Sequence, residues 1–125
     1  MKRLLLSIFA VLLLTVGTGW AGSFEDADAA YKRGNYAEAV KWLRLLAAHG
    51  HTSAQYNLGV MYANGLGVAQ DYVHAHMWFN LGATSDDAEA VNNRDFFAKK
   101  MTSRQIVQAQ QMASDCQQKN FKGCD

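Results

Sequence analysis

In the middle of the chain, apolar residues recur at helical spacing in two runs that a glycine-containing turn separates. In the first run, Ala54, Leu58 and Tyr62 are four residues apart, which places their side chains on one face of a helix. The second run has the same property, and its face consists of Ala75, Trp78, Phe79 and Gly82. The pattern therefore predicts a pair of packed helices over residues 53–64 and 71–83.

The residues at the ends of these two runs are of types that begin and end helices. Gly65 can adopt the left-handed conformation that ends many helices, and Asp71 suits the exposed N–H groups at the start of the second helix. Thr52 followed by Gln55 has the spacing of a capping box, which predicts that the first helix starts there. Glycine inside a helix costs roughly 1 kcal/mol relative to alanine, so we expect another helix to approach Gly59 closely.

The same pattern occurs earlier in the chain, at a period that indicates stacked helical pairs. Ala39 and Trp42 each lie 36 residues before a matching residue of the central pair, Ala75 and Trp78. A fixed period of this length is typical of helical solenoids. The shared repeat position favours core packing of the two tryptophans over ligand stacking. The repeat predicts two helices before the central pair, over residues 24–32 and 36–48.

After the central pair the pattern continues in a weaker form. The period carries Ala54 onto Ala90, and we expect a helix over residues 87–100. Thr102 and Gln105 make a second capping box, from which a last helix begins. Glutamines cover much of that helix, and the terminal units of a stack typically have a polar outer face. We interpret this last pair as the cap of the stack.

The central pattern as a whole resembles the Sel1-like repeat, a relative of the tetratricopeptide repeat with a longer turn between its helices. The positions that carry the repeat are Tyr36, Ala39, Trp42, Ala54, Leu58, Gly59, Tyr62, Gly65, Gly67, Asp71, Ala75, Trp78 and Ala83. The resemblance implies an all-α, right-handed solenoid of helical pairs, with about six helices. The repeat domain would cover residues 22–120, with one full repeat at about 51–86, partial repeats on either side, and a tail at 121–125.

The first residues have the pattern of a cleavable secretory signal peptide. Lys2 and Arg3 precede an apolar run over residues 4–16, and small residues precede the expected cut after Ala21. The run is shorter than the roughly 20 residues that a membrane-spanning helix needs, so cleavage is favoured over an uncleaved anchor. Together with the resemblance to secreted bacterial Sel1-like proteins, this predicts a periplasmic or secreted protein without stable membrane insertion after cleavage.

The net charge indicates which classes of partner are favoured, and the two cysteines bear on the compartment. Without Lys2 and Arg3, ten Lys and Arg (12 minus 2) face 11 Asp and Glu, a net charge of about −1. This balance gives no support for binding to nucleic acid or to an anionic membrane surface. Cys116 and Cys124 are the two cysteines. Export and the even count favour a disulfide between them, and two unpaired thiols are the alternative.

Candidate chemistry along the chain is weak. His74 and His76 are two residues apart on a helix, so their side chains point about 200° apart and cannot share one metal ion. His49 and His51 flank a loop, and we interpret all four histidines as solvated. The serines stand at helix starts or on polar faces, where capping or solvation explains them. We therefore expect no catalytic residue, no metal site and no cofactor, and a protein that is not an enzyme.

The resemblance implies that the first helix of each pair lines a concave surface on which a protein or peptide partner binds. On residues 53–64, a stripe distinct from the buried one carries amides and an apolar side chain. Its expected members, with those that the 36-residue period adds, are Asn57, Met61, Asn64, Asn93, Phe97 and Lys100. A merely solvated face is one alternative. Another is a cell-wall-related or β-lactam-processing hydrolase of the Sel1-like type, for which the chain has no catalytic motif.

Overall fold

A computed structural model describes residues 19–83 and 86–125, and these residues form six helices and no strand. In chain order the helices are α1 (Gly19–Lys32), α2 (Tyr36–Ala47), α3 (Thr52–Asn64), α4 (Tyr72–Gly82), α5 (Ala88–Ala98) and α6 (Ser103–Gln118). The structure confirms the expected all-α solenoid of about six helices. Most of the expected signal peptide, residues 1–18, lies outside the described residues. Within the described ranges no helix is long and apolar enough to cross a membrane.

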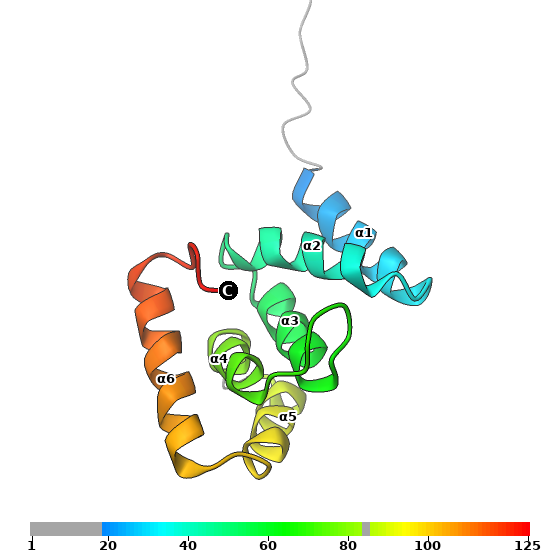
Figure 1. The fold of residues 1–125 in the computed structure, drawn as a ribbon. Helices are drawn as coiled ribbons and strands as arrows, with labels where there is room; N and C mark the ends of the chain where they lie inside the picture. Colours follow the sequence, from blue (N-terminus) through cyan, green and yellow to red (C-terminus); the bar gives the residue numbers. More distant parts are fainter. Residues whose placement is uncertain (1–18, 84–85) are drawn as a thin grey trace, which may run out of the picture.

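The helices form a short curved stack with the α3–α4 pair at its centre (Figure 1). On one side, α1 packs against α2, and α2 packs against α3. On the other side, α4 contacts both α5 and α6. The chain then returns after α6, so that its last residues lie between α6, α2 and the central pair (Figure 1). This return brings the last residues of the chain against the repeat helices.

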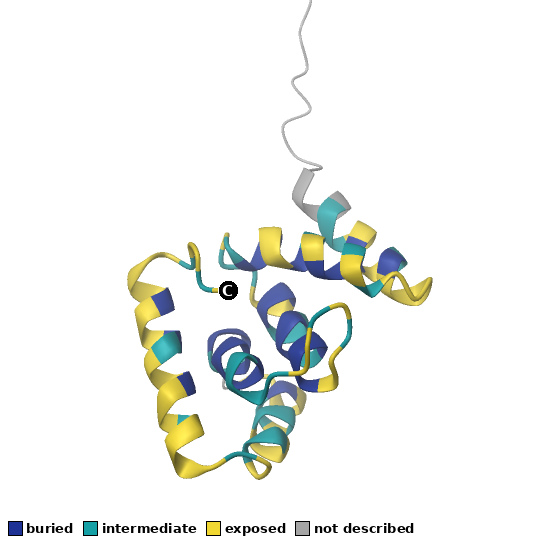
Figure 2. Ribbon diagram, viewed as in Figure 1, coloured by how far each residue is buried: buried dark blue, intermediate teal, exposed yellow. Residues whose placement is uncertain are grey.

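The core is concentrated on α3 and α4 and on the faces of α2 and α6 that turn toward them (Figure 2). The expected stripe of α3, Ala54, Leu58 and Tyr62, is buried, as is Trp78 on α4. A Cβ added at Gly59 would lie 2.8 Å from the ring of Phe79 and 3.1 Å from a backbone oxygen of α4. The predicted close approach at this glycine is therefore confirmed, and it explains why a helix tolerates glycine here.

The residues that cap the helices are those that the sequence predicts, with one exception. Gly65 ends α3 with a φ of 65°, and the carboxylate of Asp71 caps α4. The capping box of Thr102 at the start of α6 is also present. The predicted capping box at Thr52 is wrong, because the ring of His51 accepts the backbone N–H that a cap must satisfy. Gln55 is instead buried and donates to a carbonyl oxygen of α2, at 3.1 Å.

The last helix is fixed to the stack by one apolar face and a disulfide. The buried residues of α6 are Ala109, Ala113 and Cys116. Ile106 and Met112 are partly buried, and the rest of the helix is exposed to solvent (Figure 2). Cys116 is bonded to Cys124, so the favoured of the two cysteine alternatives is the one that the structure has. The disulfide holds residues 119–125 near the end of α6, where Lys122 donates to the backbone oxygen of Ala48 at 2.8 Å.

Candidate functional site

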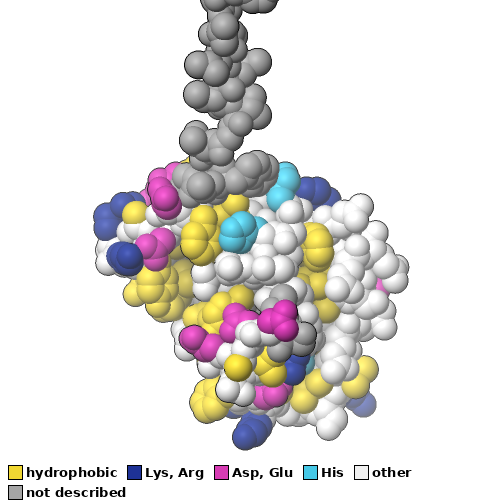
Figure 3. All heavy atoms as spheres, turned by 180° about the vertical axis from the view of Figure 1, so that it is seen from behind, with side chains coloured by type: hydrophobic (Ala, Val, Ile, Leu, Met, Phe, Trp, Pro, Cys, Tyr) yellow, Lys and Arg dark blue, Asp and Glu magenta, His cyan; other side chains and the backbone are white. Residues whose placement is uncertain are grey.

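Helices α1, α3 and α5, together with Leu43 of α2, line a hollow of about 400 Å³, here called the α1–α3–α5 hollow. Phe24 and Tyr31 of α1 form one wall, and Asn93 of α5 stands opposite. Asn57 and Val60 of α3 lie between these walls. The face seen from behind carries hydrophobic side chains next to acidic ones (Figure 3). The hollow therefore lies where the resemblance to helical repeats placed the concave surface.

The α1–α3–α5 hollow combines an apolar base with polar edges. Leu43 and Met61 line it from the core, and Met61 is 1% exposed. Asp28 on α1 and Glu89 on α5 are exposed acidic residues at its edges. Such an arrangement suits a guest with an apolar side chain and a positive charge, because burial of apolar area gives affinity and the carboxylates give charge complementarity.

The structure brings together half of the predicted binding stripe. Asn57, Met61 and Asn93 line the α1–α3–α5 hollow. Met61 does so from the core, because its side chain is almost fully covered by its neighbours. The side chain of Asn93 donates a hydrogen bond to the hydroxyl of Tyr56, which connects α5 to α3 across the hollow. This hydrogen bond helps to fix the position of α5 relative to α3.

The other half of the stripe does not line the hollow. Asn64 is exposed at the end of α3 and donates to the backbone oxygen of Val60, at 3.0 Å. Phe97 packs against the rings of neighbouring helices, with its centroid 5.9 Å from that of Phe79. Lys100 lies past the end of α5, with its Nζ 5.2 Å from the centroid of Phe96. The stripe is therefore divided among the hollow, the contact of α5 with α4 and the ends of α3 and α5.

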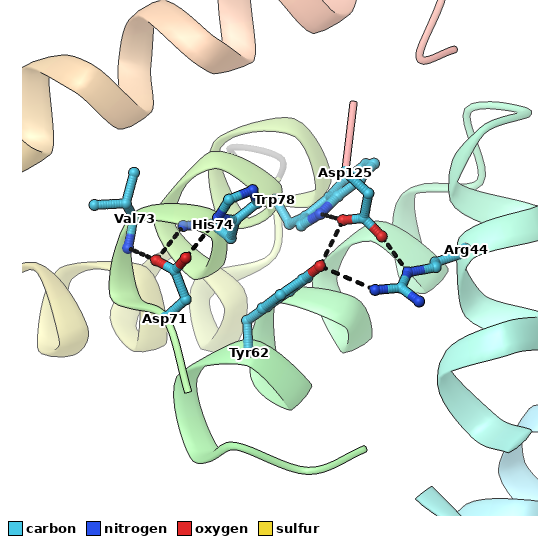
Figure 4. A network of polar contacts seen from close by, with 7 residues as sticks. All are labelled: Arg44, Tyr62, Asp71, Val73, His74, Trp78 and Asp125. Atoms are coloured by element: carbon cyan, nitrogen blue, oxygen red, sulfur yellow. Dashed lines mark hydrogen bonds and ion pairs between the residues drawn. The ribbon is translucent and has the colours of Figure 1, made fainter. Parts of the chain in front are cut away.

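A second polar site lies where the returning chain meets the repeat helices, and we call it the Asp125 site (Figure 4). One carboxylate oxygen of Asp125 accepts from the hydroxyl of Tyr62 at 2.8 Å and from Nε1 of Trp78 at 3.0 Å. The other oxygen pairs with the guanidinium of Arg44. Arg44 also donates to the hydroxyl of Tyr62 at 3.2 Å. Three helices, α2, α3 and α4, thus each direct one donor at a single carboxylate.

The surroundings keep Tyr62 in its protonated, donating form. Burial is the largest cause that raises the pKa of Tyr62, and the Asp125 carboxylate adds to the increase, while Arg44 acts against it. The ring of Tyr62 is also stacked on that of His74, with centroids 5.2 Å apart. The phenol is therefore fixed in position and available as a hydrogen-bond donor at neutral pH.

Beside the Asp125 site, the loop between α3 and α4 covers a second hollow of about 460 Å³. Arg44 and Tyr62 form one side of this loop hollow, and Asp71 and His74 form another. Burial alone would raise the pKa of Asp71, but hydrogen bonds from the backbone and ring of His74 and from the backbone of Val73 lower it. Asp71 therefore remains charged and holds the start of α4 in place.

The histidines are less solvated than the sequence suggests. His76 is 4% exposed, so the expectation of four solvated histidines is wrong for this residue. Burial is the main cause that lowers its pKa, and the nearby positive charge of Arg94 adds to the effect. His51 caps α3 and His74 pairs with Asp71 at 2.7 Å. Within residues 19–83 and 86–125, no group of three or more His, Cys, Asp or Glu residues could hold a metal ion.

The sequence pattern does not predict the Asp125 site, although it contains one signal for it. Tyr62 and Trp78 stand at repeat positions, which predict core packing, and Asp125 lies in the expected tail. The hydrogen bonds that join them span 63 and 47 residues of sequence, beyond the reach of any periodic pattern. The available signal was the pair Cys116 and Cys124, because a disulfide over eight residues forces the chain to fold back onto the end of α6.

The fold and these two sites define a short α-helical solenoid built from paired helices. The Sel1 repeat model matches residues 22–51 and 52–87, which together make up more than half of the 125 residues. The chain therefore belongs to the Sel1 repeat family. The first match covers α2 and most of α1, and the second covers the α3–α4 pair.

Two known proteins resemble the chain. An exopolysaccharide production negative regulator of Rhizobium leguminosarum bv. viciae is 35% identical over 80 residues, which is 64% of this chain and 30% of the regulator. The crystal structure of a protective antigen present in uropathogenic Escherichia coli strains, which displays an SLR fold, superposes with a TM-score of 0.73 at 29% identity. That match covers 84% of this chain and 24% of the antigen. The chain thus spans less than a third of either protein.

Proposed function

We propose that this protein is a non-enzymatic interaction module that binds an extended peptide segment of a partner protein in the α1–α3–α5 hollow. The observation that carries the proposal is the composition of this hollow, with an apolar base and polar edges between α1, α3 and α5. Membership of the Sel1 repeat family supports a scaffold for protein interaction. The similarity to a bacterial regulator supports a role through binding rather than turnover.

The chemistry of the hollow indicates what the peptide contains. Phe24, Tyr31 and Val60 offer apolar contact area for one or two side chains of the guest. Asn57 can donate to and accept from a peptide backbone, which an extended segment requires because its own backbone groups are unpaired. Asp28 and Glu89 flank the apolar surface and favour a lysine or arginine next to the apolar residue.

A selection from a random peptide library on the purified protein tests this proposal. We expect the enriched sequences to contain an apolar residue next to a lysine or arginine. Asn57→Ala should then weaken binding of an enriched peptide at least tenfold, a loss of about 1.4 kcal/mol. Asn64→Ala is the matched control, because it removes the same amide from the same helix outside the hollow. Equal binding by both variants would place the peptide elsewhere.

We further propose that the protein works outside the cytoplasm, in the periplasm or as a secreted protein. Lys2, Arg3 and the apolar run at 4–16 support this as an export signal. The disulfide between Cys116 and Cys124 supports it independently, since such bonds persist in oxidising compartments. Mass spectrometry of the protein from a periplasmic extract should give an N-terminus at Gly22. A chain that still begins at Met1 in that extract would contradict cleavage.

A further inference from the structure

We infer that Arg44, Tyr62 and Trp78 form a binding site for an acidic side chain of a partner polypeptide, and that Asp125 occupies this site from within the same chain. The inference concerns a different part of the surface from the proposed peptide hollow, and the two share no lining residue. It is independent of the proposed function, because either site can bind its ligand without the other.

The three donors belong to the repeat itself and not to the segment that supplies Asp125. Tyr62 is 8% exposed and Trp78 is 2% exposed, and both are members of the hydrophobic core. Their positions are set by packing between α3 and α4 and by the stacking of Tyr62 on His74. Core packing thus fixes two of the three donors in advance of a ligand, which lowers the entropic cost of binding, whereas the side chain of Arg44 is 47% exposed.

A carboxylate is the ligand that these donors fit. The phenol and the indole N–H both donate to one oxygen, and the guanidinium pairs with the other, so both oxygens are satisfied. Arginine binds planar carboxylates well because its N–H groups form a rigid fork. The carboxylate of Asp71 lines the adjoining loop hollow, where it pairs with the ring of His74 at 2.7 Å.

Packing of the tryptophan does not by itself require a carboxylate. Trp42 occupies the same repeat position as Trp78, 36 residues earlier. Its Nε1 is buried and has no hydrogen-bond partner among the described residues. The fold therefore accommodates a tryptophan at this position with its N–H unpaired. Packing at this repeat position therefore does not need the hydrogen bond from Trp78 to a carboxylate. That hydrogen bond is available for a ligand.

The occupant comes from a segment outside the repeat helices. Residues 119–125 follow the end of α6 without forming a helix, and the side chain of Asp125 is 24% exposed, against 47% for Arg44. The segment is attached through the disulfide of Cys124 and the hydrogen bond from Lys122 to α2. The loop hollow of about 460 Å³ adjoins Arg44 and Tyr62 and leaves room for residues on either side of an incoming acidic side chain. This room favours a polypeptide over a small free acid.

Asp125→Ala in the full chain tests the inference, because it empties the site and leaves the three donors. The probe is an acetylated synthetic peptide with the sequence of residues 119–125, in which serine replaces the cysteine. We expect this peptide to move the indole N–H resonance of Trp78 in the variant, with an affinity at least about tenfold higher than in the unchanged protein. The resonance of Trp42 is the internal control and should stay in place.

Three comparisons decide the chemistry of the ligand. The same peptide with asparagine in place of its aspartate should bind at least about tenfold more weakly. Adding Tyr62→Phe to the Asp125→Ala variant should weaken binding of the acidic peptide by a similar factor, because the phenol O–H is lost. Free acetate at the same concentration should bind more weakly than the peptide. Equal binding of acetate would overturn the assignment to a polypeptide.

A second variant keeps the inference testable if Asp125→Ala fails to fold. Cys124→Ser retains Asp125 but removes the covalent attachment of the segment, so the peptide should compete with Asp125 and shift the Trp78 resonance more than in the unchanged protein. The inference is overturned if the acidic peptide moves this resonance no further in either folded variant than in the unchanged protein, or if the asparagine peptide performs as well as the acidic one.

Discussion

The α1–α3–α5 hollow and the Asp125 site use the same central helix in opposite ways. In the hollow, α3 presents Asn57 and Val60 to open space, next to apolar rings and exposed acids. In the Asp125 site, the same helix presents Tyr62 to a carboxylate that the chain itself supplies. The first surface is open, and of its polar edge residues Asp28 pairs with Lys32 at 2.7 Å and Asn93 donates to Tyr56. The second surface is filled, and both oxygens of its carboxylate are paired.

The largest expected effect comes from truncation of Trp78 in the Asp125 site, and Trp42, which lines neither site, is the matched comparison. Trp78→Ala removes a core side chain together with a donor of the Asp125 site, and should destabilise the protein by about 3–5 kcal/mol. Trp42→Ala, at the matching repeat position, should cost less, because that side chain is only partly buried. Thermal unfolding followed by circular dichroism measures both. Equal losses would contradict the difference in burial.

The next effect concerns the attachment of the returning segment. Cys124→Ser opens the loop between α6 and the Asp125 site, and should reduce the free energy of unfolding by no more than about 3 kcal/mol, because the closed loop is short. Denaturant unfolding of this variant and of the oxidised protein gives the value. The binding of a peptide in the α1–α3–α5 hollow should not change, since the disulfide lies on the other side of the stack. A loss of peptide binding would show that the two regions are coupled.

Local rules explain why the fold and much of the hollow could be predicted. The 36-residue period and the four-residue spacing of Ala54, Leu58 and Tyr62 depend on contacts within one helix or between neighbouring helices. The same rules predict that Asn57 and Asn93 lie on one surface, and in the structure both residues line the hollow. They failed at Phe97, which follows the period but packs beside Tyr72 and Phe79 of α4.

The Asp125 site could not be predicted, because it depends on where the chain goes after the last helix. Arg44 and Asp125 are 81 residues apart and share no repeat position. Only the spacing of the two cysteines limits the direction of the segment, and it does not indicate which helix the segment reaches. His76 was misjudged for a related reason. Its burial depends on the approach of α5 to α4, and residue spacing within α4 says nothing about that neighbour.

Removal of a single polar group from each region should produce a smaller difference in the free energy of unfolding. Tyr62→Phe deletes one hydroxyl from a fully paired, buried site and should cost about 1 kcal/mol of stability. Asn57→Ala deletes an amide at the edge of the open hollow and should change stability by no more than about 0.5 kcal/mol. Denaturant midpoints measured side by side give both values. A larger loss for Asn57→Ala would mean that the hollow is a structural element and not a free surface.

The smallest expected effect is a dependence of local stability on pH. It should be larger at the hollow than at the Asp125 site. Burial lowers the pKa of His76 below the value of about 6.5 that it has when the chain is unfolded. The unfolded chain therefore binds a proton at a higher pH than the folded protein does. The stability that depends on neutral His76 is fully present above about pH 6.5 and decreases as the pH falls toward the lowered value.

The charged groups around His76 indicate which region responds to this change. Arg94 disfavours the protonated ring, Asp95 favours it, and both belong to α5, which also carries Asn93 at the hollow. Hydrogen exchange of every amide slows as the pH falls, so the readout is the protection factor, which is the intrinsic rate divided by the measured rate. The protection factors of the α5 amides should decrease between pH 7 and pH 5, with less change in α2. His76→Gln removes the titrating group and should abolish the difference between the helices. If α2 and α5 lose protection together in the unchanged protein, protonation destabilises the whole stack and the two regions are not independent.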